Sequence, residues 1–377
     1  MLVNNFAVFQ AQTDKAPRRK ILLISNLLMH YRVPVYNYFH RRFRASGYEF
    51  SVIADAIQKQ NQRPLEFEFH ELPFDFLRYR KAINDENPSA VILFLHLKDP
   101  ITWPLIHWLR IRRIPFAFWT KGGNWDAKQS NLRFHIFNYV HRIADALILY
   151  SEGCREFIKP RFRSKAFVAN NTINFEDFPS IRESKEQIKE EFRVPFKKVV
   201  IFMGRMGAEN GRKRVDHIIE VFRTLTREDV GLVLVGSGLS RQLLARMNRR
   251  NTIYLGEVHD EKDVRISKLC KMADLCAIPG HVGLALNQAF YWGLPVITEE
   301  CNQPPEICYL KPGRNGFVVP WGDLRSLRDR MLYLLDNDDV RSAFSRCARQ
   351  TILDEASIEG MFSSFRDCVS FMDRGSL

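Results

Sequence analysis

Short apolar segments alternate with helical patterns along almost the whole chain, and this alternation limits the fold more than any other feature. The segment KILLISNLL at 20–28 is apolar enough for a strand buried on both faces, and a helical pattern follows it in VPVYNYFHRRF. YEFSVIA, SAVILFLHL, IPFAFWT and ADALILYSE continue the series, with helical segments such as WPLIHWLRIRR between them. Strands that alternate with helices form a parallel sheet covered on both faces. The sequence therefore predicts an α/β fold of the doubly wound type.

The alternation stops once and then starts again, which indicates two domains. Residues 174–198 are polar and charged, and the strand pattern returns with KVVIFMGRM, followed by VGLVLVGSG, NTIYLGEV, ADLCAIPG, GLPVITEE and GFVVPW. A chain of 377 residues is also too long for one ordinary core. We expect a flexible leader over 1–18, Rossmann-like domains over 19–185 and 196–355, and a final amphipathic helix within 356–377. Ligands of such domains bind at the carboxyl ends of the strands, so two facing domains predict a site in the cleft between them.

Cysteine usage and the lack of long apolar segments indicate the compartment. The seven cysteines have no regular spacing, which argues against a disulfide framework and for a reducing environment. Cys270 and Cys276 lack a second pair and neighbouring histidines, so we expect buried hydrophobic residues and no zinc site. No segment reaches the roughly 18 apolar residues of a membrane span. In MLVNNFAVFQAQTDKAPRRK the basic cluster follows the apolar part, the reverse of a secretory signal, so we expect a cytoplasmic protein.

Positive charge is concentrated in the first half of the chain. The net charge is +13, and residues 1–180 contain 26 lysines and arginines against 16 acidic residues. Basic clusters recur at Arg18/Arg19/Lys20, Arg78/Arg80/Lys81, Arg110/Arg112/Arg113 and Lys159/Arg161/Arg163/Lys165. Such clusters bind nucleic acid, anionic lipid headgroups or a phosphorylated substrate, and each alone is also compatible with a solvated surface. Their concentration in one domain favours a polyanionic partner.

Glycine-rich loops follow strands of the second half, and such loops can hold phosphate groups. In GRMGAENGRKRVDHIIEVF a strand ends at Gly204, and Arg205 and Lys213 bracket the loop before a helix that opens at Val215. Fixed positive charges beside exposed backbone N–H groups suit a diphosphate. The plain alternative is an ordinary strand-to-helix loop with solvated basic side chains. VLVGSGLS, with Gly236, lacks the third glycine and the acidic residue of a dinucleotide site, so an NAD site is disfavoured.

The stretch PGHVGLALNQAFYWGLPVIT at 279–298 is a further loop of this kind. Gly280 and Gly283 allow the backbone to approach a ligand closely. The N–H groups of Val282, Gly283 and Leu284 are expected to point outwards from the start of a helix over 284–292, whose positive end favours an anion. The alternative interpretation is a tight turn in which the glycines serve steric purposes.

Taken in order, GRM…KRVD, LVGSG, YLGEV, ADLCAIPG, VGL…GLPVIT and NGFVVPW resemble the donor-binding domain of the GT-B glycosyltransferases, specifically glycosyltransferase family 4, or group 1. The resemblance covers about residues 198–340 without interruption. It implies a GT-B fold in which two Rossmann-like domains face each other across a cleft. The first domain would then bind the acceptor and the second the donor, and the final helix would cross back to the first domain.

The resemblance also implies roles for individual residues. Arg205 and Lys213 fall on the basic pair that neutralises the donor diphosphate, where negative charge grows as the sugar leaves. The backbone near Val258 falls where the family holds the base. The whole donor-binding set implied in this way is Gly204, Arg205, Lys213, Gly236, Val258, His281, Val282, Gly283, Leu284, Gln288 and Glu306. Such enzymes need no metal and no other cofactor as a rule.

The sequence departs from the family at two positions. Where the family has two glutamates eight residues apart, this chain has Gly280 and Gln288. Gln288 can still bond a ribose hydroxyl, whereas Gly280 offers backbone alone, so His281, Asn287 or Glu306 would have to supply polar contacts. A subgroup of the family with P-G-x-V-G-L at this place resembles the chain more closely, which favours a variant site over a decayed one.

Candidates in the first domain rest on weaker patterns. Lys121, in FWTKGG, takes the place of a strand-end histidine that faces the donor sugar in the family, although a lysine with an ordinary pKa is a poor base. His96 follows a strand and is the second catalytic candidate, against the alternative of a structural histidine. His30 and Arg32, in LLMHYRVP, are expected to contact the acceptor.

These observations predict a glycosyltransferase that moves a hexose or deoxyhexose from a nucleotide diphosphate sugar to a glycan or lipid-linked acceptor, with retention at the anomeric carbon. The basic first domain suggests an anionic membrane surface at the inner face of the cell membrane and a role in surface polysaccharide assembly. Two alternatives stay open. One is a GT-B protein that binds nucleotide sugar with weak or no catalysis. The other is a basic nucleic-acid-binding protein, which no recognised nucleic-acid-binding motif supports.

Overall fold

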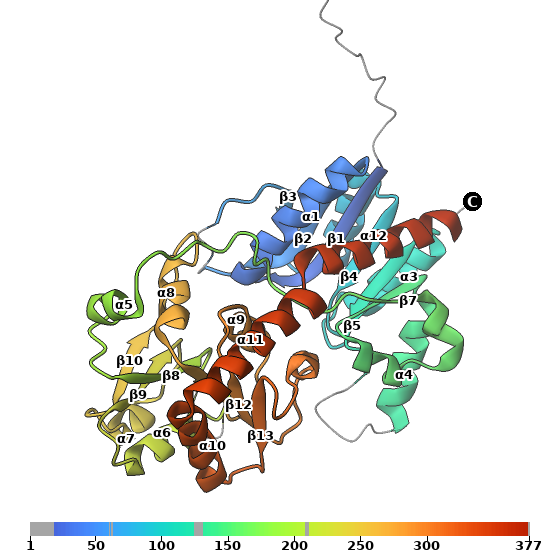
Figure 1. Cartoon of the computed structure of the whole chain (residues 1–377). Helices are drawn as coiled ribbons and strands as arrows, with labels where there is room; N and C mark the ends of the chain where they lie inside the picture. Colours follow the sequence, from blue (N-terminus) through green and yellow to red (C-terminus); the bar gives the residue numbers. More distant parts are fainter. Residues whose placement is uncertain (1–18, 60, 62, 124–130, 208–210, 376–377) are drawn as a thin grey trace, which may run out of the picture.

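The computed structural model describes residues 19–59, 61, 63–123, 131–207 and 211–375, and these form two α/β domains (Figure 1). The sequence expectations for 1–18 lie outside the described residues. Each domain is built on one parallel sheet, with the strand order β3-β2-β1-β4-β5-β6-β7 in the first and β10-β9-β8-β11-β12-β13 in the second. The predicted pair of doubly wound domains is therefore confirmed.

The first domain contains strands β1 Arg19–Leu28, β2 Tyr48–Ile57, β3 Glu68–Glu71, β4 Ala90–Phe94, β5 Phe116–Thr120, β6 Ala146–Leu149 and β7 Ala166–Val168. Its helices are α1 Val33–Ala45, α2 Phe76–Glu86, α3 Thr102–Ile111 and α4 Asn131–Ile143, with the short 3-10 helices η1 His30–Arg32, η2 Glu152–Phe157 and η3 Pro160–Lys165. The central strands β5 and β6 are buried along their whole length and β4 up to its last residue, as the continuous apolar runs predict.

Strand β3 is an addition to the series expected from the sequence. Its segment EFHE is charged and partly exposed, so it carries no apolar run that would indicate a strand. It pairs with β2 from Ser51 to Ala54 and forms the edge of the sheet, where one side of the strand has no neighbour. Charged side chains suit such an edge because they discourage pairing with another chain.

The second domain contains strands β8 Lys198–Met203, β9 Val230–Val235, β10 Thr252–Gly256, β11 Leu275–Ala277, β12 Val296–Glu299 and β13 Gly316–Val319. Its helices are α5 Lys185–Glu191, α6 Val215–Thr224, α7 Arg241–Arg246, α8 Val264–Met272, α9 Leu284–Tyr291, α10 Leu324–Asp336 and α11 Asp338–Glu355, with the 3-10 helix η4 Pro305–Tyr309. Ser184 and Gln187 form a reciprocal capping box at the start of α5, which fixes the entry into this domain.

The last helix, α12 Ile358–Gly375, belongs in space to the first domain (Figure 1). Phe362 and Phe365 are buried in the same core as β1 and α1, and the ring of Phe365 lies 4.7 Å from that of Phe39. Ser364 Oγ also donates a hydrogen bond to the carbonyl of Val168 at the end of β7. The chain thus crosses between the domains twice, once after β7 and once before α12.

The seven cysteines are all free thiols, and Cys270 and Cys276 are fully buried. Among the helices described, none combines the length and the apolar character that crossing a membrane requires.

Candidate active site

The carboxyl ends of both sheets face a cavity of about 620 Å³ between the domains. His30, Tyr31 and Gln58 line it from the loops after β1 and β2. Ile173, Asn174 and Phe178 come from the connection between the domains. Met29 and Pro34 also belong to the first domain, and the second domain supplies the remainder, from the ends of β8 and β9 and the segments that follow β8 to β11. This is where ligands bind in open α/β sheets.

Most of the residues singled out from the sequence meet in this cavity. His30, Gly204, Arg205, Lys213, Gly236, Val258, Val282, Gly283, Leu284 and Gln288 all line it. Arg32, His96, Lys121, His281 and Glu306 are not among the described residues that line it. The agreement is therefore close in the second domain and poor in the first.

Lys213 is the central cation of the cavity. Its ammonium donates hydrogen bonds to the carbonyls of His281 at 2.9 Å and Val282 at 2.8 Å. Burial lowers the pKa of Lys213 to about 8, so the group is predominantly charged at neutral pH. Arg205 lies at the exposed rim of the same cavity. A diphosphate placed between them would meet one partly buried cation and one exposed cation.

Gly280 has no room for any side chain. A Cβ atom there would lie 2.1 Å from the carbonyl oxygen of Arg212. The two loops are also tied by backbone hydrogen bonds, from Gly280 N–H to Lys213 O at 3.0 Å and from His281 N–H to Arg212 O at 2.8 Å. The glutamate expected at this place in the family is thus replaced by the backbone of the 212–213 segment.

The start of α9 differs in one respect from the sequence expectation. The N–H of Val282 was expected to face a ligand, but it donates to Gln303 Oε1 at 3.1 Å. Gln303 is buried and its Nε2 bonds the carbonyl of Gly280, so its carboxamide holds the 279–283 loop from behind. Gly283, at φ 55°, and Leu284 remain at the first turn of α9, where backbone N–H groups have no intrahelical partner.

His30 is held in one tautomer by Gln58. Gln58 Oε1 accepts from the backbone N–H of His30 at 3.2 Å and lies 2.9 Å from His30 Nδ1. Because the backbone group is a donor, the shared atom is the oxygen, and Nδ1 must carry the proton. Burial lowers the pKa of His30, which keeps the ring neutral and leaves Nε2 as an acceptor.

The cavity also contains residues that the sequence analysis did not select. His259 lies opposite His30 with the ring centroids 4.9 Å apart, and Asp263 forms an ion pair of 2.7 Å with Arg63 of the first domain. Both follow the YLGEV segment by a few residues. Their position just after the predicted strand could have indicated that they lie at the cavity. They close one end of the cavity by direct contacts between the domains.

Arg32, His96 and Lys121 have other surroundings than those expected of them. Arg32 is 3% exposed and stacks on the ring of Trp119 at 4.6 Å, so it is a buried residue behind the cavity wall. His96 is exposed after β4, where its carbonyl accepts from Thr102 Oγ1. Lys121 is exposed after β5, with its ammonium 5.9 Å from the Tyr150 ring. The catalytic roles of His96 and Lys121 stay predictions.

Glu306 and His281 were expected to contact the donor, and neither lines the described cavity. Glu306 is 5% exposed and accepts a hydrogen bond from Asn171 Nδ2 at 2.5 Å. His281 takes part through its backbone, as the partner of Lys213 and Arg212. The side chain of Glu306 is thus engaged outside the described cavity, and the contacts of His281 with the 212–213 segment are those of its backbone.

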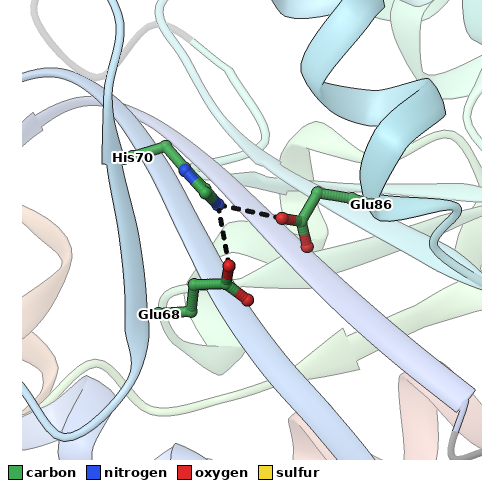
Figure 2. A group of neighbouring side chains, drawn as sticks. All are labelled: Glu68, His70 and Glu86. Atoms are coloured by element: carbon green, nitrogen blue, oxygen red, sulfur yellow. Dashed lines mark hydrogen bonds and ion pairs between the residues drawn. The ribbon is translucent and has the colours of Figure 1, made fainter.

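One group of side chains in the described part of the chain has the composition of a metal site, and it lies far from the cavity at the β3 edge. Figure 2 shows His70 between Glu68 and Glu86, with Nε2 3.4 Å and 2.9 Å from their carboxylates. The ammonium of Lys20 lies 2.6 Å from Glu86 and 3.4 Å from Glu68. This cation pairs with both carboxylates, so the geometry is that of an ion-pair network.

Fold and site together define the protein's class: two Rossmann-like domains with a cleft between them form a GT-B fold. HepE of Anabaena, solved with UDP and glucose, has this fold, with a TM-score of 0.71 at 15% identity over 94% of this chain and all of that chain. WaaG, a glycosyltransferase of lipopolysaccharide biosynthesis, gives 0.68 at 14% identity over 93% of this chain and 99% of its own.

The family of the second domain follows from the sequence comparison. Residues 197–337 match the family described as "Glycosyl transferases group 1", so the chain carries a domain of this family. A phosphatidyl-myo-inositol mannosyltransferase of Mycobacterium leprae is 26% identical over 163 residues, which are 41% of this chain and 42% of that protein. A poly(ribitol-phosphate) alpha-N-acetylglucosaminyltransferase of Staphylococcus aureus is 21% identical over 205 residues, 53% of this chain and 39% of that protein. The matches thus span about two fifths of the length of these curated relatives.

Proposed function

We propose that the protein is a glycosyltransferase that moves a sugar from a nucleotide diphosphate sugar to a glycan or lipid-linked acceptor in cell-surface polysaccharide assembly. The observation that carries the proposal is the cavity in which Arg205, Lys213 and the start of α9 converge inside a glycosyl transferases group 1 domain. The mannosyl- and N-acetylglucosaminyltransferase names of the relatives support a hexose donor. Retention at the anomeric carbon rests on the family resemblance alone.

The proposed chemistry assigns the diphosphate to the cations. When the bond between the sugar and the phosphate breaks, negative charge develops on the leaving diphosphate. Lys213 and Arg205 would stabilise that charge, with the N–H groups at the first turn of α9, so we propose that no metal is needed. Gln288, which lines the cavity, would bond a ribose hydroxyl through its carboxamide.

A screen of nucleotide sugars tests the proposal directly. The matching donor at about 100 times its dissociation constant should stabilise the fold by about 2.7 kcal/mol, seen as a rise in melting temperature. Release of nucleoside diphosphate with an acceptor present should persist in EDTA, and proton NMR of the first product should show the configuration of the donor. Stabilisation by nucleotides without any transfer would favour the alternative of a non-catalytic nucleotide-sugar-binding protein. That alternative draws on the lack of both family glutamates.

A face of the first domain supports the membrane part of the proposal. The connections β3-α2-β4, β4-α3-β5 and β5-α4-β6 step the same way across the sheet, so right-handed crossovers place α2, α3 and α4 on one face. Leu77, Ile111 and Leu132 are 67%, 79% and 71% exposed on these helices. The helices α3 and α4 contain no acidic residue, and the flanking basic side chains are Arg78, Arg80, Lys81, Arg110, Arg112, Arg113, Arg133 and Arg142.

Exposed apolar side chains within a basic face fit the surface of an anionic bilayer. The apolar side chains enter the headgroup region, and the basic side chains pair with lipid phosphates. We expect the protein to float with vesicles that contain anionic lipid and to be released by high salt. Ile111→Glu together with Leu132→Glu should abolish flotation and leave donor binding intact. Wild-type protein that stays in solution with these vesicles would contradict the membrane part.

A further inference from the structure

Asn171 lies at the point where the chain first crosses between the domains, and every polar group it has is engaged. The residue is 2% exposed. Its backbone N–H donates to the carbonyl of Tyr150 in the first domain at 2.7 Å. Its backbone carbonyl accepts from Asn287 Nδ2 at 3.1 Å and from the Tyr309 hydroxyl at 3.4 Å, both in the second domain. A single buried residue therefore joins the two domains.

The side chain of Asn171 connects a buried cation of the first domain to a buried anion of the second. Arg32 Nη2 donates to its Oδ1 at 2.7 Å, and its Nδ2 donates to Glu306 Oε1 at 2.5 Å. Arg32 Nε and Nη1 have no hydrogen-bond partner among the described residues, so within them the bond to Asn171 is the one hydrogen bond of the guanidinium. Trp119 supports the guanidinium from one side at 4.6 Å. The series Arg32–Asn171–Glu306 is hereafter called the relay.

A carboxamide is suited to the middle of this relay. It offers an oxygen to the guanidinium and an NH2 group to the carboxylate, whereas a carboxylate or an apolar side chain can serve one of them at most. A buried charge that loses its partner is costly, so the relay holds its three members in one arrangement.

Resting on the proposed function, we infer that Arg32, Asn171 and Glu306 are positioning residues that fix the two domains in the arrangement needed for sugar transfer. Asn287, which bonds the Asn171 carbonyl, is the neighbour of Gln288 on α9, and Gln288 lines the cavity. The relay thus sets where α9 and its cavity residues lie relative to the first domain. The cation pair Arg205 and Lys213 belongs to the second domain alone, so donor affinity does not depend on the relay.

The first test needs no enzymatic activity. Spin labels are attached to keto amino acids that replace the exposed Arg44 of α1 and Arg325 of α10, and double electron–electron resonance measures the distance between the domains. Asn171→Asp removes the NH2 donor and sets a second carboxylate against Glu306, so the distance distribution should broaden. Asn251→Asp is the matched control, because Asn251 is 4% exposed and bonds Phe222 O within the second domain. An unchanged distribution in Asn171→Asp, or equal broadening in Asn251→Asp, overturns the inference.

The second test separates positioning from general destabilisation by kinetics. Asn171→Asp and Arg32→Lys should lower kcat, by up to about 10²-fold for the first, with the donor KM near the wild-type value, since misplacement by about 1 Å costs this much. Asn251→Asp should keep wild-type kcat. A rise of the donor KM with unchanged kcat would contradict the relay's role. If wild-type protein transfers no sugar from any donor, the proposed function fails, and the distance measurement still decides the arrangement of the domains.

Discussion

The two domains form their halves of the cleft in different ways. The second domain contributes mainly backbone and short contacts: the 212–213 segment fills the space beside Gly280, and Lys213 bonds two carbonyls of the 279–283 loop. The first domain contributes side chains that depend on one another, such as His30 on Gln58, and behind the cavity wall Arg32 depends on Asn171 in the same way. On the proposed function, the backbone contacts of the second domain suit the constant nucleotide diphosphate. The interdependent side chains of the first domain suit an acceptor that differs among enzymes.

The largest effect is expected at Gly280, which packs against the backbone of Arg212. In Gly280→Ala the new methyl group would meet the carbonyl of Arg212, which cannot move without separating the two loops. We expect a loss of stability at the upper end of about 1–3 kcal/mol, measured by urea unfolding, together with loss of nucleotide binding. Gly47→Ala in the first domain is the control, because its Cβ meets nothing and only its φ of 85° is unfavourable, at about 1–2 kcal/mol. Intact nucleotide binding in Gly280→Ala would refute the close packing of the loops.

The next effect concerns the partly buried cation Lys213. Lys213→Met keeps the length of the side chain and removes the charge, so nucleoside diphosphate should bind more weakly by about 1.5–3 kcal/mol, the range for hydrogen bonds to charged groups. Isothermal titration calorimetry measures this loss. Lys121→Met makes the same change in the first domain, where the residue does not line the described cavity, and should leave nucleotide affinity unaltered. Equal losses in both variants would remove the distinction between the domains.

The pH dependence of donor binding also tests the role of the Lys213 charge. Because burial lowers the pKa of Lys213 from 10.5 to about 8, the ammonium is present at pH 7 and is lost as the pH rises through about 8. Diphosphate affinity should therefore fall above pH 8, and bound diphosphate should in turn raise the pKa of the lysine. Calorimetric titrations from pH 7 to pH 9.5 measure the fall. In Lys213→Met the affinity should be low and flat over this range, and a slope that persists there would assign the effect to another group.

The sequence could predict the positions of residues that local strand and helix patterns determine, and it could not predict contacts between distant segments. Gly204, Lys213 and Gly283 occupy places that strand ends and helix starts determine, so their positions in the cavity followed from local pattern. The hydrogen bond that occupies the Val282 N–H depends on Gln303, which lies 21 residues further along the chain. The contacts of Arg32 depend on Asn171, 139 residues away, and those of Glu306 on the same residue. Such pairings are set by the packing of the two domains, which no local pattern describes.

The smallest effect is expected at His30, where the first domain reaches the cavity. Gln58 Oε1 holds Nδ1–H and leaves Nε2 as an acceptor, so the ring can accept a hydrogen bond from a ligand hydroxyl. His30→Phe removes the acceptor, and Gln58→Leu removes its support. Each should lower kcat/KM for the acceptor, with donor affinity unchanged. The rise in the activation free energy should be about 0.5–1.5 kcal/mol, the net contribution of one neutral hydrogen bond. Because both substitutions break one unit, the double variant should lose no more than His30→Phe alone. Additive losses would show that the two residues act separately, and the first domain would then be built, like the second, from independent contacts.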